Sequence, residues 1–294
     1  MLKITNKHGL PEVFVTLANK QTYTKGASQY SVTEIMSSPK IKRLTDKHYH
    51  EMETDVADMM WQLIGSAIHN ILENAKTDNH LTEERLFVDV DGVVVSGQID
   101  LQHETESGVL VTDFKTTSAW AFMKNKKEWE EQLNVYKWLV ETVKRKKVSG
   151  LFITAIIRDW SRNDKRETYP KAPVQNLEIP MWDSVRAETF VRERLDLHRD
   201  SKISHHLGDD LRDCTPEERW MTETVYAVKR EGRKTAIKIY SDLNDAQERA
   251  KEEKGYVEVR PGEPRRCAEF CGVAKWCDQY QRELGEQDSG AFEA

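Results

Sequence analysis

Two aspartates and a lysine lie close together in the middle of the chain, in a Gly-Gln-Ile-Asp segment that ends at Asp100 and in an Asp-Phe-Lys segment over 113–115. Asp113 and Lys115 are two apart on a predicted strand, so their side chains point to the same face. Two carboxylates and an amine are costly to bury without partners. A divalent cation bound by the carboxylates, with the lysine beside its water, removes that cost. The pattern predicts a metal-dependent site that cuts phosphodiesters.

Polar residues on the neighbouring predicted helices extend this pattern. Gln132 interrupts an apolar stripe, where a buried amide needs a partner, and Tyr136 lies one turn later on the same face. His69 and Glu73 are likewise four apart on the helix before the strands. His69 alone is more typical of a structural histidine than of a metal ligand, and Asp-x-Lys alone recurs by chance. The joint order is the stronger signal.

The hydrophobic periodicity predicts elements that can hold these residues. An Asp91-Gly92 pair indicates a tight hairpin between two of the strands. The predicted order is helix, three-strand meander, helix, buried strand and helix, over 55–75, 85–90, 93–101, 109–115, 128–147, 150–157 and 181–199. This order predicts an α/β core built on a mixed sheet.

The C-terminal part has a different character. It is predicted to contain a hairpin over 226–240, a helix over 241–254 and a strand over 256–260. We expect an N-terminal lead-in over 1–50, a core over 51–204, a cysteine-containing module over 205–282 and a frayed tail over 283–294.

Composition sets limits on the class of protein. The chain has 294 residues, enough for one large or two modest domains, and 38% apolar with 32% charged residues is typical of a soluble globular protein. Its first eight residues have no apolar signal region, which favours a reducing cytoplasm and no membrane. A net charge of −6 does not point to nucleic acid, although phosphate contacts need only one basic surface. No phosphate-binding loop of the G-x-x-x-x-G-K-[ST] type is present, so no ATP-driven motor is predicted.

Four cysteines suggest a second metal site. Cys267, Cys271 and Cys277 lie in a C-x3-C-x5-C run, and Cys214 is far upstream. In a reducing compartment such clustering favours metal over disulfides. Four thiolates suit either zinc or a [4Fe–4S] cluster, and zinc sites usually show paired knuckles that this spacing lacks.

These segments together resemble the PD-(D/E)XK nuclease superfamily and, within it, the RecB-like branch that includes the AddB nuclease domain, CRISPR adaptation nucleases and phage-encoded exonucleases. The resemblance covers about 65–136 and 214–277. It implies a restriction-endonuclease-like core of mixed sheet flanked by helices, with a small α+β C-terminal iron–sulfur module. It also implies that His69, Asp100, Asp113 and the Phe114 carbonyl bind Mg²⁺ or Mn²⁺.

The remaining roles follow from the same resemblance and from the chemistry of the residues. Lys115 orients or deprotonates the attacking water. Gln132 and Tyr136 match the family's Q-x-x-x-Y pair and contact the lysine, the water or the DNA strand. Glu73 either acts through a water or is a solvated helix carboxylate.

The cysteine spacing is similar to the iron–sulfur site of the AddB-type relatives, in which one cysteine is remote and three are close. It implies a [4Fe–4S] cluster bound by Cys214, Cys267, Cys271 and Cys277, with zinc as the alternative. The chain departs from the relatives in two respects. Cys214 follows the nuclease core instead of preceding it, and the close pair is C-x3-C instead of C-x2-C.

The sequence therefore predicts a metal-dependent exonuclease that acts on DNA ends, single- or double-stranded, in the cytoplasm of a bacterial or phage-infected cell. A recombinase or a single-strand annealing protein is the expected protein partner. Three alternatives remain open: a structure-selective endonuclease, an inactive DNA-binding recombination partner and a zinc-stapled interaction protein.

Overall fold

The chain forms two compact units in the computed structural model, which describes residues 2–20, 24–75, 77–124 and 127–290. The first unit comprises Met1–Lys42 and Tyr49–Asp210, and the second comprises Arg43–His48 and Leu211–Ala294. The last four residues of the predicted tail lie outside the described part of the chain.

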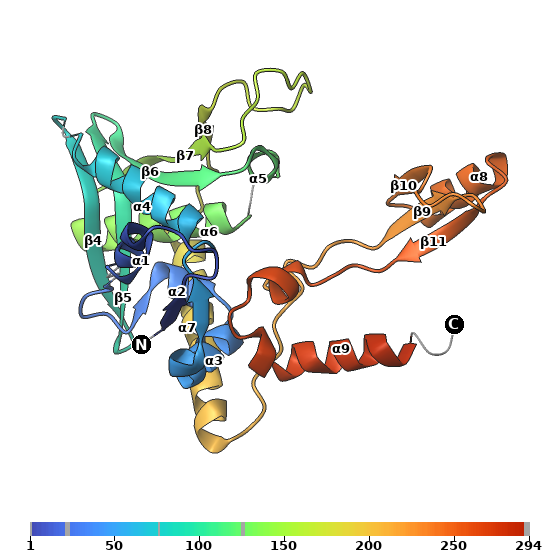
Figure 1. Cartoon of the computed structure of the whole chain (residues 1–294). Coiled ribbons are helices and arrows are strands. Elements are labelled where there is room, and N and C mark those ends of the chain that lie inside the picture. The colour runs from blue at the N-terminus through green and yellow to red at the C-terminus, as the bar shows by residue number, and fades with distance from the viewer. Residues whose placement is uncertain (1, 21–23, 76, 125–126, 291–294) are drawn as a thin grey trace. The chain divides into compact units, whose positions relative to one another are not determined.

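A six-stranded mixed sheet forms the centre of the first unit (Figure 1). Its strands are β2 (Tyr30–Ser31), β4 (His80–Val90), β5 (Val93–Thr105), β6 (Gly108–Thr117), β7 (Val148–Ile157) and β8 (Val174–Glu178). β5 pairs in antiparallel fashion with β4 and β6 and in parallel with β2. β6 then pairs in parallel with β7, and β8 is antiparallel to β7. The predicted mixed α/β sheet is confirmed.

The β4–β5 hairpin turns at Asp91 and Gly92, whose φ angles are +52° and +80°. Positive φ at both positions is what a two-residue hairpin turn of this hand requires. Val90 pairs with Val93, and the same register continues along both strands as far as His80 and His103. The tight turn thus fixes which residues face each other down the whole hairpin.

Helices cover the sheet and bury most of the core. They are α2 (Val32–Met36), α4 (Met60–Glu73), α5 (Ala119–Met123), α6 (Lys127–Leu139), which continues as a π-helical turn over Val140–Lys144, and α7 (Ser184–Leu207). The core includes Leu133 and Leu139 of α6 and Leu151 and Ile153 of β7. Helix α6 therefore packs its apolar face on the sheet, as its periodicity predicts.

Helix α4 buries less than its sequence predicts. Its apolar positions were expected to form one buried stripe, yet Leu63 is the only buried residue of the helix. Ile64 and Ile71 are exposed. An apolar stripe records which face could be buried, and whether a neighbour covers that face depends on the tertiary fold.

The N-terminal segment joins this unit through several short elements. They are β1 (Lys3–Thr5), α1 (Glu12–Asn19), the start of α3 (Pro39–His48), a 3₁₀ turn over Tyr49–Glu51 and β3 (Glu53–Asp55), which pairs with β1 in parallel. The rest of α3, from Arg43, belongs to the second unit. Arg194 and His198 of α7 bind the Ile35 carbonyl at the end of α2, with N···O distances of 2.9 and 3.1 Å. These contacts satisfy carbonyl groups at the C-terminal end of α2, which have no N–H partner within the helix.

The second unit contains a three-stranded antiparallel sheet with one helix packed on it. Its elements are β9 (Val225–Lys229), β10 (Lys238–Tyr240), α8 (Leu243–Glu252), β11 (Tyr256–Arg260), a π-helical turn over Arg266–Phe270, a 3₁₀ turn over Ala274–Trp276 and α9 (Asp278–Gly290). A small core of Val228, Ala246 and Ala250 holds the sheet and α8 together. Every helix in the described part of the chain is too short or too polar to cross a lipid bilayer.

Candidate active site

The site forms where β6 leaves β5. The β5–β6 pairing ends at Leu101 and Thr112, whereas the β6–β7 pairing continues to Thr117 and Ile157. One residue further along, Asp100 Oδ2 accepts the backbone N–H of Phe114 at 2.7 Å. The carboxylate satisfies a backbone donor that has lost its strand partner. The strand divergence therefore places Asp100 beside Asp113.

Lys115 is held by groups from both the sheet and α6. Its Nζ atom lies 2.7 Å from Asp113 Oδ2 and donates to Gln132 Oε1 at 3.0 Å. The Gln132 amide in turn donates to the Tyr136 hydroxyl at 2.8 Å. Lysine has several rotatable bonds, and these contacts fix its ammonium group in one place.

Gly97 allows α6 to approach the strand that carries Asp100. A Cβ atom at this position would lie 2.5 Å from Leu139 Cδ1 and 3.0 Å from the Tyr136 ring. Such contacts are shorter than van der Waals separation, so a side chain here would displace the helix or the ring. The glycine thereby sets the distance between the Gln132–Tyr136 pair and the two aspartates.

His69 bridges α4 and the strands. Its Nε2 atom lies 3.2 Å from the Phe114 carbonyl oxygen, and its Nδ1 atom lies 3.3 Å from Glu83 Oε1 and 3.6 Å from Asp100 Oδ1. The hydrogen bond to Glu83 raises the pKa of the imidazole, with a further contribution from the negative charge of Asp100, although burial opposes the change. Both ring nitrogens of His69 therefore lie next to oxygen atoms of the site.

The carboxylates of Asp100 and Asp113 are close enough for their negative charges to repel each other. Burial, followed by the negative charge of Asp113, raises the pKa of Asp100 to about 7. Asp113 is also buried, and its Oδ2 atom has the Lys115 ammonium nearby but no hydrogen bond of good geometry within the described residues. Carboxylate and carbonyl oxygens with one imidazole nitrogen form a donor set suited to Mg²⁺ or Mn²⁺. The residues present thus fit a divalent cation.

Glu83 belongs to the site, although sequence reasoning missed it. His69, Glu83 and Asp100 each offer a ligand atom within 4.8 Å of the others. The second Glu83 oxygen accepts from Gln98, which is itself bound by Arg85. Glu83 has a φ of +53°, an uncommon conformation for a residue with a side chain and one that often marks a functional position.

The sequence contained a signal for Glu83. The two-residue turn pairs Val90 with Val93, so counting seven residues back and seven forward sets Glu83 opposite Asp100. The expected strand began at 85, two residues too late to include it. The observed strand β4 begins at His80.

These side chains line one cavity of about 520 Å³ in the first unit. His69, Asp100, Asp113, Lys115, Gln132 and Tyr136 contribute to it. Glu73 lies at its edge and is exposed, and it is outside the group that could share a metal ion. The structure thus brings seven of the predicted site residues, Glu73 included, to one cavity, with the Phe114 carbonyl beside His69.

The cysteines all belong to the second unit. Cys214 and Cys277 are buried, and Cys267 and Cys271 are partly buried. Burial raises the pKa of the Cys271 thiol, and the neighbouring Cys267 and Cys277 act in the same direction. Among the described residues no three cysteine sulfurs lie within 4.8 Å of one another. They do not form the arrangement of a tetrahedral zinc site, whose sulfurs are about 3.8 Å apart.

Gln279 fixes the remote cysteine to the end of the cysteine run. Its side-chain carbonyl accepts from the Cys214 N–H at 2.8 Å, and its amide donates to the Cys214 carbonyl at 3.1 Å. Gln279 is two residues beyond Cys277 and is buried. No sequence pattern predicts this contact, because a glutamine in a polar helix is usually solvated.

A family model and a solved structure are similar to this chain. A family model described as "PD-(D/E)XK nuclease superfamily" matches residues 33–278, from α2 to the start of α9. A solved structure titled "Crystal structure of SSO0001" is similar at 16% sequence identity, with a TM-score of 0.45 over 63% of this chain and 85% of that chain. No curated protein matches the chain.

Proposed function

The chain belongs to the PD-(D/E)XK nuclease superfamily, and on that premise we propose that it is a metal-dependent deoxyribonuclease of the RecB-like branch that degrades DNA from its ends. One observation carries the proposal. Asp100, Asp113 and Lys115 lie in one cavity with His69, and Gln132 binds the lysine. An inactive binding protein has no need for this combination of buried charges, which is costly to maintain.

Four groups would hold the cation: the carboxylates of Asp100 and Asp113, the Phe114 carbonyl and His69 Nε2. The last two atoms are 3.2 Å apart, close to the roughly 3.0 Å between neighbouring ligands of an octahedral Mg²⁺ ion. Glu83 accepts the Nδ1 proton, which orients the ring and leaves Nε2 for the cation. When bound, a divalent cation lowers the pKa of water and polarises the phosphodiester.

Lys115 supplies a positive charge next to these ligands, where negative charge develops on the phosphate oxygens. One N–H group binds Gln132 and another faces Asp113, so the third N–H group can meet the attacking water or a non-bridging phosphate oxygen. There Nζ stabilises the negative charge that builds on phosphorus-bound oxygens. Gln132 and Tyr136 keep the ammonium in that position. The carboxylates, the carbonyl and the imidazole would thus hold the cation, and the lysine would stabilise the phosphate beside it.

Action on DNA ends is supported by the resemblance to RecB-like exonucleases and by the absence of a phosphate-binding loop from the sequence. Without a motor, a nuclease of this kind must meet a free strand that is already accessible. A structure-selective endonuclease would cut closed circles, and an exonuclease that needs ends would not, so closed circular DNA distinguishes the two activities.

We also propose that Cys214, Cys267, Cys271 and Cys277 bind a [4Fe–4S] cluster. The support is their spacing in the sequence and the Gln279 contact that fixes Cys214 next to Cys277. The role would be structural, since the cleavage reaction transfers no electrons and the core of this unit is small.

The experiment compares linear and covalently closed DNA of one sequence with Mn²⁺, Mg²⁺ and EDTA. Linear DNA should be degraded only with metal, and closed circles should persist. Asp113→Asn and Lys115→Met should each lower the rate about a thousandfold, because each removes stabilisation of the transition state. Cleavage that persists in EDTA or in Asp113→Asn would refute the mechanism. Rapid cutting of closed circles would refute the requirement for ends.

A further inference from the structure

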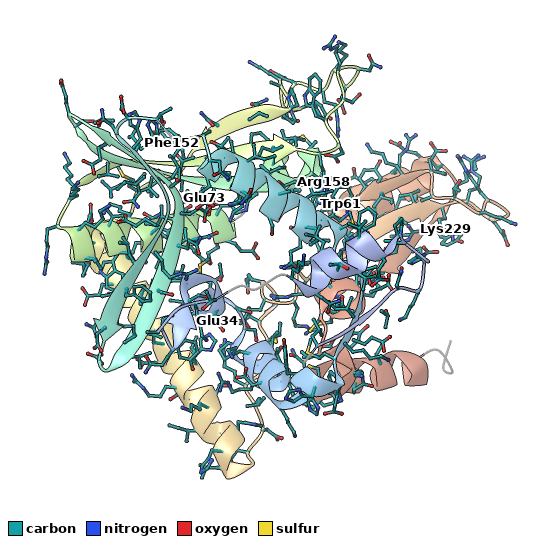
Figure 2. All side chains as sticks on the ribbon, turned by 60° about the vertical axis from the view of Figure 1, so that its left-hand side comes forward. Glu34, Trp61, Glu73, Phe152, Arg158 and Lys229 are labelled. Carbon is teal, nitrogen blue, oxygen red and sulfur yellow. The ribbon has the colours of Figure 1, made fainter. Side chains whose placement is uncertain are left out.

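Trp61 and Arg158 form an exposed stacked pair at the N-terminal end of α4 (Figure 2). The Arg158 guanidinium carbon lies 4.4 Å from the centre of the indole ring. Trp61 remains 55% exposed with this cation on it, and Arg158, which directly follows β7, is exposed as well. A large aromatic surface next to an unshielded positive charge is therefore open to solvent.

This pair differs from the other arginine–tryptophan contact of the first unit. Arg186 lies 4.1 Å from the Trp182 ring centre, but Trp182 is a buried core residue that the arginine covers from outside. Trp61 is not part of the core. Within the described residues the Arg158 side chain has no carboxylate partner. Packing and charge pairing thus do not explain why these two side chains meet.

Trp61 lies on the same side of helix α4 as the candidate metal ligand His69. Trp61, Gly65 and His69 follow each other at intervals of four residues on α4, so they form one ridge of the helix. Eight residues of helix separate Trp61 from His69, a rise of about 12 Å. Gln62, Gly65 and Ser66 line the cavity between them. Figure 2 shows Trp61 and Arg158 at one end of this helix and Glu73 at the other.

We propose that Trp61 and Arg158 form a platform for single-stranded DNA, on which an unpaired base stacks a few nucleotides from the phosphodiester that would be cleaved at the cavity of Asp100 and Asp113. Aromatic rings bind bases of any sequence because every base has a π face, and arginine adds an interaction with the backbone phosphate. Inside a duplex both faces of a base are covered by its neighbours. This inference rests on the proposed nuclease function and specifies the strand state that its substrate has at the site.

The test is a binding measurement in EDTA, where no cleavage occurs. A labelled single-stranded oligonucleotide is titrated with the full-length protein, and a series of variants carries one abasic site at each position in turn. Loss of the stacked base should weaken binding about 5- to 150-fold at one position. Trp61→Ala should bind the intact strand more weakly by a similar factor and should lose its sensitivity to that position. Trp61→Phe should restore part of both effects.

Trp120→Ala is the matched control, since Trp120 is 58% exposed and has Lys124 as its cation but lies on α5. It should keep the abasic profile of the wild type. Arg158→Gln should reduce the slope of log affinity against log salt by about 0.7, the value for one phosphate contact on a single strand. An unchanged abasic profile in Trp61→Ala overturns the platform.

Three further outcomes distinguish failure of this inference from failure of the proposed function. If the wild type cleaves linear DNA but Trp61→Ala binds normally, only the platform is wrong. Equal affinity for a blunt duplex, with equal loss in Trp61→Ala, overturns the single-strand assignment. If the wild type neither binds nor cleaves DNA, the proposed function fails, and the platform fails with it.

Discussion

Glu83 and Asp100 lie between the strand pairs Thr82–Leu101 and Glu84–Ile99 of β4 and β5, and both carboxylates face the Nδ1 atom of His69. The positive φ of Glu83 shows that the strand adopts an unfavourable conformation at this point. A carboxylate that accepts the proton of a ligating histidine fixes its tautomer and makes the other nitrogen a better ligand. The register set by the turn at Asp91 thus places the carboxylates that orient His69 of helix α4.

We predict that Glu83→Gln raises the metal concentration needed for half-maximal cleavage about ten- to a hundredfold. Glutamine keeps the size of the side chain but cannot accept the imidazole proton as a carboxylate does. The neighbouring Glu84→Gln is the control, because Glu84 binds Lys144 and Gln102 instead. The measurement is a Mn²⁺ titration of the cleavage rate. Identical curves for the two variants would exclude Glu83 from the metal site.

A comparison of two histidines tests whether His69 is a ligand or a structural residue. His69→Ala should raise the metal requirement while leaving the melting temperature within a few degrees of wild type. His198 is fully buried and binds the Ile35 carbonyl, so His198→Ala should lower the melting temperature instead. Thermal unfolding and metal titration are measured on both variants. If His69→Ala unfolds or keeps the wild-type titration, it has a structural role.

Gln132 is predicted to position Lys115 and not to bind metal. Gln132→Leu should therefore lower the maximal rate about ten- to a hundredfold while the Mn²⁺ concentration at half-maximal rate stays the same. Asn134→Leu is the matched control, because Asn134 of the same helix binds the Pro180 carbonyl and the Trp182 N–H. That variant should lose stability. A shifted metal requirement in Gln132→Leu would contradict the positioning role.

The sequence predicted those parts of the fold and site that depend on local order. The strand containing Asp113 and Lys115 and the helix containing Gln132 and Tyr136 form as expected, because alternation and helical periodicity are local properties. The contact between Gly97 and Tyr136 brings distant segments together, and no local pattern contains it. The exposure of Trp61 could likewise not be predicted from the sequence, since it depends on which side chains of α4 the rest of the chain covers.

The final prediction concerns the link between Cys214 and Gln279. Gln279→Leu would remove both hydrogen bonds between Gln279 and the Cys214 backbone, and the loss of a buried hydrogen bond costs about 1–3 kcal/mol. If Cys214 ligates the cluster, this variant should lose iron and absorbance at about 400 nm after anaerobic purification. Gln281→Leu is the control, because Gln281 is exposed and makes one long contact to Ala274.

The spectrum of Cys214→Ala then decides whether the contact acts through the metal site. Loss of absorbance in both Cys214→Ala and Gln279→Leu, with Gln281→Leu unchanged, is expected when the amide holds a ligand in place. A wild-type spectrum in Cys214→Ala would remove that cysteine from the site and leave Gln279 a purely structural role. Colourless wild-type protein with one equivalent of zinc would replace the cluster by zinc, which requires the sulfurs to move to within about 3.8 Å of each other.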